Sequence, residues 1–357
     1  RIDKDGVYSN GSCCGNDTAS ERSMVKKYIV DSVSYWADEY HIDGFRFDLV
    51  GLLDTETINA IVENVHKKHP NVIFYGEGWT MPTGVTKEGY LMATQLNSAE
   101  TPEFAYFSDT IRDGLKGRVF YADAKGYVTG AEHMTEVIEA CLLGQPDWCK
   151  NPSQTINYAS CHDNYTLMDK IALSLPEAAR EEWIASSRLA AAVYMLAQGV
   201  PLIHAGEELL RSKVDEQGAY VENSYDAPDF VNQMNWSVLG QEEYQKTCQY
   251  YKGLIQIRKK YTSLRYMTGE EVNAHMQLLK PQEENVIVAA IRDVEKQEEL
   301  ILIFNPNRKD VQVSVPEGMW DILVKEEYAD VKPLEKMSGK SISVAPISAM
   351  VLAKCAN

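Results

Sequence analysis

The amino-acid sequence predicts an α/β fold followed by an all-β C-terminal region. Five short apolar segments have the character of buried parallel strands and alternate with segments of helical periodicity: 44–48, 72–76, 104–107, 155–160 and 200–204. After about Thr262 the helical periodicity ends and only short strand-like runs follow. The sequence therefore predicts a β/α domain over residues 1–262 and a β-sandwich domain over residues 263–357.

The helices of the β/α part are predicted from start signals and apolar spacing. Thr18-Ala19-Ser20-Glu21 has the form of a capping box, in which a hydroxyl and a carboxylate bind free N–H groups at a helix start. The apolar positions that follow recur at helical spacing: Val25, Ile29, Val33, Trp36 and Tyr40. A second box, Ser174-Leu175-Pro176-Glu177, predicts a long helix that ends near Gln198.

The region after Thr262 has the pattern of an antiparallel β domain. Six short runs are expected to be its strands: 286–291, 300–304, 311–315, 320–324, 341–344 and 350–353. Turn residues separate these runs, such as Pro316-Glu317-Gly318 between the third and the fourth. We therefore expect a small β-sandwich at the C-terminus.

The composition limits the classes of function. The chain has 357 residues, 45% of them hydrophobic, and a formal net charge of −17. A charge of this sign argues against nucleic acid and against an anionic membrane surface as partners. No apolar run approaches the roughly 18 residues that a membrane-spanning helix needs.

The cysteines bear on localisation. Their number, seven, is odd and their spacing has no framework pattern, so reduced thiols in a cytoplasmic protein are the simplest interpretation. No signal peptide is visible. Because the chain begins at Arg1 and not at Met, a secreted protein stays an alternative.

Three of the predicted strands end in a carboxylate. In Gly44-Phe45-Arg46-Phe47-Asp48, aromatic and charged residues alternate, so Arg46 and Asp48 face the same side of the strand. Glu77 follows the second predicted strand and Asp163 follows the strand that begins at Thr155. Catalytic groups gather at the C-terminal ends of parallel barrel strands, so we expect these three carboxylates to be functional.

At these strand ends the sequence resembles a known family. Gly44–Asp48, Gly76–Trp79 and His162–Asn164 are similar to the second, third and fourth signature regions of the α-amylase superfamily, glycoside hydrolase family 13. Their residues are closest to the type I pullulanases, the debranching branch of that family. Segments outside the motifs are also similar to this group: Ser9–Glu21, Arg112–Gly117, Ala205–Glu208, Asn223–Tyr225 and Asp229.

The resemblance implies a (β/α)8 TIM barrel followed by a C-terminal β domain. A closed barrel has eight strands, whereas about five strand-helix units precede residue 262. We therefore expect the chain to be the C-terminal part of a larger enzyme, without the family's first signature region. Its sheet should then have open edges, which the missing N-terminal half or a second copy of the chain would cover.

The resemblance also implies a retaining glycoside hydrolase, in which one carboxylate attacks the sugar and one carboxylic acid protonates the leaving oxygen. Asp48 matches the nucleophile and Glu77 the acid and base. Asp163 matches the third carboxylate, which holds ring hydroxyls. Arg46 is expected to keep Asp48 ionised and oriented.

Other residues match positions that contact glucan in the family. His162 is expected to donate to the sugar, and Trp79 offers a flat apolar face for stacking on it. Asn164, Asn223 and Tyr225 match further glucan contacts of the pullulanase group. A role in the core stays open for Trp79, and loop packing stays open for Asn223 and Tyr225.

The leading hypothesis is hydrolysis of α-1,6-glucosidic linkages in pullulan, starch or glycogen-type branched glucans. The alternatives are isoamylase-like or α-1,4 amylase activity, or a glucan-binding fragment that is catalytically incompetent because the first three barrel strands are absent. Gly78 and Asn164 favour the pullulanase type over the isoamylase type. No cysteine–histidine spacing suggests zinc, no metal site is predicted, and calcium is left open.

Overall fold

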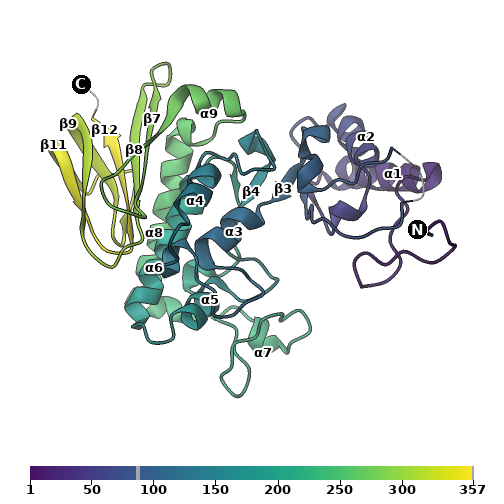
Figure 1. The fold of residues 1–357 in the computed structure, drawn as a ribbon, viewed down its shortest axis with the longest axis horizontal. Helices are drawn as coiled ribbons and strands as arrows, with labels where there is room; N and C mark the ends of the chain where they lie inside the picture. The colour runs from purple at the N-terminus through teal and green to yellow at the C-terminus, as the bar shows by residue number, and fades with distance from the viewer. Residues whose placement is uncertain (86–88, 356–357) are drawn as a thin grey trace. The chain divides into compact units, whose positions relative to one another are not determined.

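The computed structural model describes residues 1–85 and 89–355 (Figure 1), and the chain folds into two compact units. Unit 1 comprises Arg1–Phe107 and Asp147–Ile156, and unit 2 comprises Ser108–Pro146 and Asn157–Asn357. The predicted domain boundary at residues 262/263 lies inside unit 2 and stays a prediction. None of the helices in residues 1–85 and 89–355 combines the length and the hydropathy of a membrane-spanning segment.

Five short strands form one sheet in chain order: β1 (Gly44–Phe47), β2 (Ile73–Gly76), β3 (Ala105–Phe107), β4 (Thr155–Asn157) and β5 (Val200–Pro201). Strands β1 to β4 pair in parallel. Each strand falls within a segment that the sequence predicted, and each is shorter than that segment. With the helices that alternate with it, this sheet is a partial (β/α) barrel, as predicted.

The described residues of unit 1 contain two α-helices, α1 (Ser23–Tyr40) and α2 (Thr55–His66), and an apolar core. The apolar face of α2 lies in that core with Phe74 of β2 and Phe104 before β3. The N-cap of α2 is Asp54, whose carboxylate accepts a hydrogen bond of 2.9 Å from the N–H of Thr57. This buried cap fixes the start of α2 directly after the loop that follows β1.

Both predicted capping boxes are wrong. Helix α1 begins at Ser23, and its N-cap, Arg22, makes no side-chain cap. The Ser20 hydroxyl instead donates to Asp54 (2.6 Å), and Glu21 pairs with Arg1 (2.9 Å). In the second box, Ser174 is the last residue of a helix and donates to backbone carbonyls. In both boxes, tertiary partners or a preceding helix hold the side chains that local capping would use.

Unit 2 contains seven α-helices within the described residues: α3 (Asp109–Lys116), α4 (Thr135–Leu142), α5 (Leu167–Ser174), α6 (Arg180–Leu196), α7 (Asp229–Asn232), α8 (Glu242–Lys260) and α9 (Gly269–His275). Short 3-10 turns connect elements in both units: Val50–Leu52, Gln95–Glu100, Tyr127–Thr129, Pro152–Gln154, Glu207–Leu209, Trp236–Gly240 and Thr262–Leu264. Helix α6 is buried along most of its length, because it lies at the centre of the unit's apolar core.

The C-terminal part of unit 2 is all-β, as predicted. Its strands form one antiparallel sheet: β6 (Met276–Leu279), β7 (Ile287–Asp293), β8 (Glu298–Asn305), β9 (Val311–Lys325), β10 (Tyr328–Ala329), β11 (Glu335–Val344) and β12 (Ser348–Lys354). The expected turn at 316–318 is wrong, because β9 runs through it. Gly318 there pairs with Gly339 of β11, so the third and fourth predicted strands are one.

Both faces of the β7–β8 part of the sheet are covered. Alternate residues of β7, Ile287 and Ala289, lie in one core with the helices α3, α4, α6 and α8. The intervening Val288 lies in a second core with Val311 and Val313 from the first half of β9. The sheet therefore closes over its own outer face like a sandwich, while its inner face packs on helices (Figure 1).

Candidate active site

The end of β1 carries two charged side chains on one side, as the alternation predicted. Phe45 and Phe47 pack against the core of unit 1, while Arg46 and Asp48 form an ion pair with Nη1 2.5 Å from Oδ1. The second nitrogen of the same guanidinium, Nη2, lies 3.1 Å from Oε1 of Glu77. One arginine thus bridges the carboxylates that follow two neighbouring parallel strands.

The two bridged carboxylates have different surroundings. The Asp48 side chain is 74% exposed, whereas the Glu77 side chain is 10% exposed. The buried oxygen Oε2 of Glu77 accepts a hydrogen bond of 3.0 Å from the N–H of Leu49. Leu49 has a left-handed backbone with φ of 43°, which turns its N–H toward Glu77 directly after Asp48. Asp48 is therefore open to a ligand, and Glu77 is held in place.

Two glycines allow the loops after β1 and β2 to lie against their neighbours. A Cβ on Gly51 would lie 2.0 Å from the carbonyl oxygen of Trp79, and a Cβ on Gly78 would lie 2.4 Å from the Tyr106 ring. Neither position has room for a side chain. Trp79 itself is half-buried, which is compatible with stacking on a sugar and with a core role.

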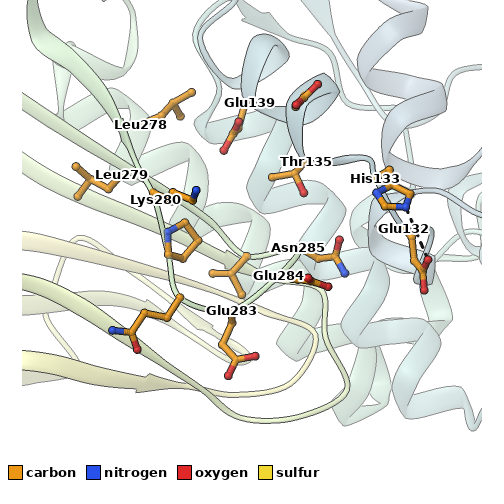
Figure 2. A pocket seen from close by; sticks show the side chains of 14 residues that line it. Glu132, His133, Thr135, Glu139, Leu278, Leu279, Lys280, Glu283, Glu284 and Asn285 are labelled. Carbon is orange, nitrogen blue, oxygen red and sulfur yellow. Dashed lines mark ion pairs between the residues drawn. The ribbon is translucent and has the colours of Figure 1, made fainter.

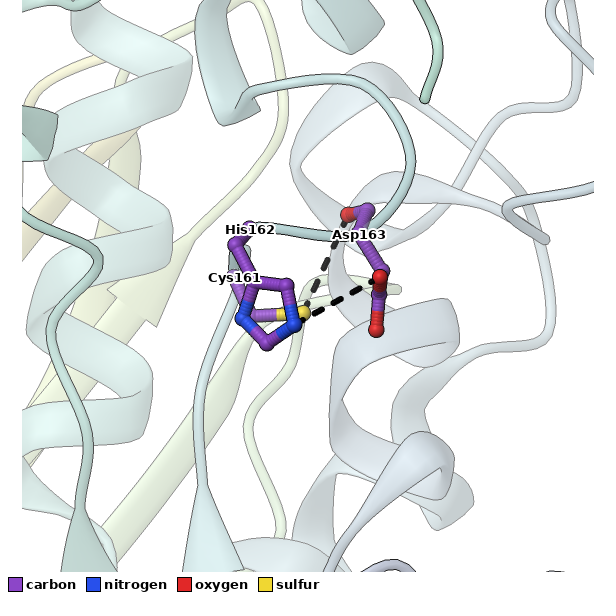
Figure 3. Close-up of side chains that lie close together, drawn as sticks. All are labelled: Cys161, His162 and Asp163. Carbon is purple, nitrogen blue, oxygen red and sulfur yellow. Dashed lines mark hydrogen bonds and ion pairs between the residues drawn. The ribbon is translucent and has the colours of Figure 1, made fainter. Parts of the chain in front are cut away.

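The third predicted carboxylate lies in unit 2, on the loop after β4. Asp163 lies 3.5 Å from Nε2 of His162, and both side chains are substantially exposed, at 46% and 64% (Figure 3). The N–H of Asn164 donates to Oδ1 of Asn223 at 3.0 Å. This contact brings together two predicted glucan contacts, and it also matches the loop-packing alternative for Asn223.

The structure therefore gathers the predicted site residues into two groups, one in each unit. Arg46, Asp48 and Glu77 are held together in unit 1, with Trp79 two residues further on. His162, Asp163, Asn164 and Asn223 are held together in unit 2. Tyr225, also in unit 2, is 82% exposed. This exposure is compatible with contact to a glucan and with a loop residue that has no ligand.

The comparison with known families accounts for most of the chain. Residues 14–236 match the family described as alpha amylase, catalytic domain, and residues 272–328 match the pullulanase all-beta domain. The chain belongs to the α-amylase family, in its pullulanase branch. The sequence had indicated this membership, and the match supports it over both the β/α part and the β part.

Individual relatives of this α-amylase-family chain are pullulanases. A pullulanase of Bacillus subtilis is 36% identical over 325 residues, which are 88% of this chain and 44% of that protein. The solved pullulanase of Bacillus acidopullulyticus is 34% identical with a TM-score of 0.91, over 99% of this chain and 43% of that one. The chain thus spans about half the length of the relatives that it matches.

A third comparison bears on ligands. The structure of a pullulanase from Anoxybacillus, described as complexed with maltotetraose, matches 99% of this chain and 50% of that one at 34% identity, with a TM-score of 0.89. The α-amylase-family fold of this chain is therefore found in a protein that holds a maltooligosaccharide.

Sequence reasoning assigned no role to Glu207, which supports the loop of the unit 2 site. It is 3% exposed, and its carboxylate accepts hydrogen bonds from the hydroxyls of Ser160 (2.6 Å), Tyr194 (2.7 Å) and Tyr251 (2.8 Å). Burial raises the pKa of this carboxyl group. Because Ser160 is two residues from His162, the network fixes the start of the His162–Asp163 turn. No sequence pattern indicated that this glutamate is buried.

Two further buried groups lie in the same unit and were also missed. Lys116 is 1% exposed, its Nζ donates to the carbonyl of Tyr165 (3.4 Å), and burial lowers its pKa to about 8. His204 is 9% exposed, and burial, followed by the charge of Arg211, lowers its pKa to about 3, so its imidazole is neutral at pH 7.

Unit 2 also has an acidic surface cavity of about 700 Å³ between α4 and the β6–β7 connection (Figure 2). Glu132, Glu136 and Glu139 line it from one side and Glu283 and Glu284 from the other. It contains none of the predicted site residues. Among the residues that the structure describes, no Phe, Tyr or Trp lines it, so it lacks the flat apolar faces on which sugars stack.

Proposed function

We propose that the chain carries the catalytic groups of a retaining glycoside hydrolase that cleaves α-1,6-glucosidic linkages in pullulan and in starch-type or glycogen-type glucans. The observation that carries this proposal is the Arg46 bridge between Asp48 and Glu77. Two carboxylates held by one guanidinium lie close enough to act on the same sugar.

The surroundings of the two carboxylates suit two different roles. Asp48 is exposed and its carboxylate is held by the guanidinium of Arg46, as suits a nucleophile that must be oriented to attack the anomeric carbon. Glu77 is buried and fixed through Oε2 by the N–H of Leu49, as suits a group that protonates the leaving oxygen and then deprotonates water. The Arg46 charge also favours the separation of charge as the glycosyl–Asp48 ester breaks.

The residues of unit 2 would hold the sugar. Asp163 accepts and His162 donates, so the pair can bind two hydroxyl groups of one ring and stabilise its distorted form. Trp79 would stack on a sugar face, and Asn164, Asn223 and Tyr225 would contact further glucose units. Each of these roles is a proposal that a substitution can test.

The names of the relatives support a glucan as substrate. The similar structures are described as pullulanases in complex with maltotetraose, maltotriose or maltohexaose. Since the chain spans about half of such proteins, we also propose that a further polypeptide, either an N-terminal half-barrel or a second copy, completes the site. A cytoplasmic location is part of the same proposal and rests on the odd number of cysteines, whose spacing has no framework pattern.

Release of reducing sugar from pullulan tests this function. The chain is assayed alone and after addition of the N-terminal part of the Bacillus subtilis pullulanase, with Asp48→Asn as the inactive variant. Asp43→Asn is the matched control, because Asp43 is an exposed aspartate at the other end of the same strand. We expect maltotriose in at least one of the two assays, loss of it in Asp48→Asn, and no change in Asp43→Asn.

The assay also separates the alternatives. Maltotriose shows cleavage of α-1,6 linkages in pullulan, whereas panose or isopanose would show α-1,4 cleavage instead. Activity on glycogen without activity on pullulan would favour the isoamylase-like alternative. No turnover in either assay, with binding of maltotetraose retained, would favour the glucan-binding alternative and contradict catalysis.

A further inference from the structure

Three side chains of different chemistry meet at the loop after β4. The thiol of Cys161, the imidazole of His162 and the carboxylate of Asp163 each offer one ligand atom, and these atoms all lie within 4.8 Å of one another (Figure 3). Among residues 1–85 and 89–355, no other group of three or more His, Cys, Asp or Glu side chains meets this condition. Three consecutive residues match no familiar zinc motif, so the spacing of cysteines and histidines did not indicate a metal here.

The three groups are placed to accept a metal from solvent. The thiol of Cys161 is half-buried and donates to the carbonyl of Asp163 at 3.8 Å, on the inner side of the loop. His162 and Asp163 are open to solvent on the outer side, with Nε2 and Oδ1 3.5 Å apart. A cation bound by all three would therefore keep at least one coordination position open to water or to an inhibitor.

We propose that this cluster is a binding site for a borderline-soft divalent cation, with Zn²⁺ as the favoured ion. A set of one sulfur, one imidazole nitrogen and one carboxylate oxygen suits Zn²⁺ and does not suit Ca²⁺ or Mg²⁺, which prefer oxygen ligands alone. Ligand atoms in a tetrahedral zinc site lie roughly 3.5 Å apart, given metal–ligand distances of about 2.0–2.3 Å. The ligand atoms of the cluster lie within 4.8 Å of one another, so they must approach by at most about 1.3 Å to reach this spacing.

Binding at the cluster changes bonds in a simple way. The thiol of Cys161 loses its proton to solvent and forms a zinc–sulfur bond. Nε2 of His162 and a carboxylate oxygen of Asp163 give up their contact with each other and coordinate the ion. The site therefore forms without any oxidant or reductant.

The consequence rests on the proposed function, which assigns His162 and Asp163 to the sugar. An ion that holds both side chains prevents them from binding ring hydroxyls. Zinc and glucan therefore cannot bind to the chain at the same time. Zinc is then a reversible inhibitor whose effect a chelator removes. Cys161 is the residue that makes this inhibition strong, because it supplies the one sulfur ligand.

The test measures metal binding without turnover. CoCl₂ is added to the chain in a Cys13→Ser/Cys14→Ser background, since the exposed adjacent thiols at 13 and 14 could bind metal themselves. We expect a thiolate-to-cobalt charge-transfer band with a stoichiometry of one, displaced by ZnCl₂. We further expect Cys161→Ser to lose the band and to weaken zinc binding by about tenfold or more in calorimetry.

Controls make the outcome decisive. Cys248→Ser removes another half-buried thiol and should leave the band unchanged. The thermal midpoint of Cys161→Ser, measured without metal, reports whether that variant folds, and His162→Asn should also lower zinc affinity. Absence of the charge-transfer band in the parent chain, or its persistence in Cys161→Ser, would overturn the site.

An activity assay with zinc distinguishes failure of this inference from failure of the proposed function. If the chain releases maltotriose from pullulan, zinc should suppress that release and a chelator should restore it. If zinc binds through Cys161 but leaves turnover unchanged, the exclusion of glucan is wrong while the metal site stands. If no pullulan is cleaved at all, the cobalt spectrum still decides whether the site exists.

Discussion

The arginine at position 46 acts at the scale of single residues, because its planar guanidinium has two nitrogen atoms that contact two different carboxylates. Nη1 contacts Asp48 and Nη2 contacts Glu77, so one side chain fixes the relative position of both. A lysine has one ammonium group on a flexible stem and cannot hold two carboxylates in this fixed geometry.

We therefore expect Arg46→Lys to lower kcat/KM for pullulan by about 100-fold, mainly through kcat, because misplaced reacting groups affect the transition state more than substrate binding. Steady-state kinetics in the assay that shows turnover give the two constants separately. Arg22→Lys is the matched control, since the Arg22 side chain is 63% exposed and pairs with Glu21 at 3.7 Å, a carboxylate outside the predicted site. A wild-type kcat in Arg46→Lys would contradict the bridging role.

A second residue-scale prediction concerns the close approach at Gly51. Alanine there places a Cβ 2.0 Å from the carbonyl oxygen of Trp79, which is backbone and cannot rotate away. We expect Gly51→Ala to lower the free energy of unfolding by about 2 kcal/mol, measured by urea denaturation. Gly240→Ala is the control, because a Cβ at Gly240 meets no atom within 4 Å, and it should change stability by less than about 0.5 kcal/mol.

The buried lysine of α3 gives a pH prediction. Burial lowers the pKa of Lys116 to about 8, so above this pH the folded chain releases a proton that the unfolded chain retains up to about 10.5. The unfolded state then binds more protons, and stability rises with pH in this window. We expect the unfolding free energy of the wild type minus that of Lys116→Met to rise by up to about 3 kcal/mol between pH 7 and pH 10.5. A flat difference would show that Lys116 is not buried as a charged group at neutral pH.

The alternation of residues 44–48 predicted the side on which Arg46 and Asp48 lie, because strand geometry fixes it. The contact of Arg46 with Glu77 could not be predicted from residues, because it depends on the register between β1 and β2, where Arg46 is paired with Tyr75. Glu207 shows the same limit. Its three hydroxyl partners come from distant segments, so only the folded chain reveals that it is buried.

At the scale of elements, the position of a helix start is decided by tertiary partners as much as by local sequence. Asp54 caps α2 through Thr57 and also accepts from Ser20, a residue of the loop before α1. The same Ser20 was part of the predicted capping box for α1, but its hydroxyl donates to Asp54 instead. The helices themselves were predicted from apolar spacing, which depends on burial and is independent of the cap.

We therefore expect Asp54→Ala to lower the free energy of unfolding by about 2 kcal/mol, because it removes a buried cap and leaves the Ser20 hydroxyl without an acceptor. Thr18→Ala removes the exposed threonine of the box that does not form. It should cost less than about 0.5 kcal/mol in the same urea titration. Equal losses in both variants would mean that the predicted box does stabilise α1.

At the scale of the whole molecule, each unit has its own apolar cores. The core of unit 1 contains α1, α2 and the β1–β3 strands, whereas one core of unit 2 extends from Ile111 of α3 to Val351 of β12. The five parallel strands and the all-β region were predicted from the sequence, because their periodicities differ. The division into units was not, because it depends on which cores the segments 147–156 and 263–357 join.

This arrangement of cores predicts which helices and strands unfold together in local opening. Leu302→Ala in β8 should lower hydrogen-exchange protection in the sheet and in α6 together, by about 3 kcal/mol, since both share one core. Ile58→Ala in α2 should lower protection in unit 1 and leave α6 unchanged. Protection that falls in β8 but not in α6 after Leu302→Ala would instead support a β domain that opens by itself, as the predicted boundary at 262/263 implies.

The core that joins helices to the sheet also limits how evolution can exchange parts of this chain. Strand β7 alternates between two apolar cores of unit 2, so its inward residues, such as Ile287 and Ala289, are buried only while α6 and α8 are present. A crossover near residue 262 between distant homologues would join a sheet to helices that had not been selected to fit it. A crossover between the helices of unit 1 and α3 should therefore give a folded protein more often than a crossover between α8 and β7. The β region and helices α3 to α8 should then be inherited together.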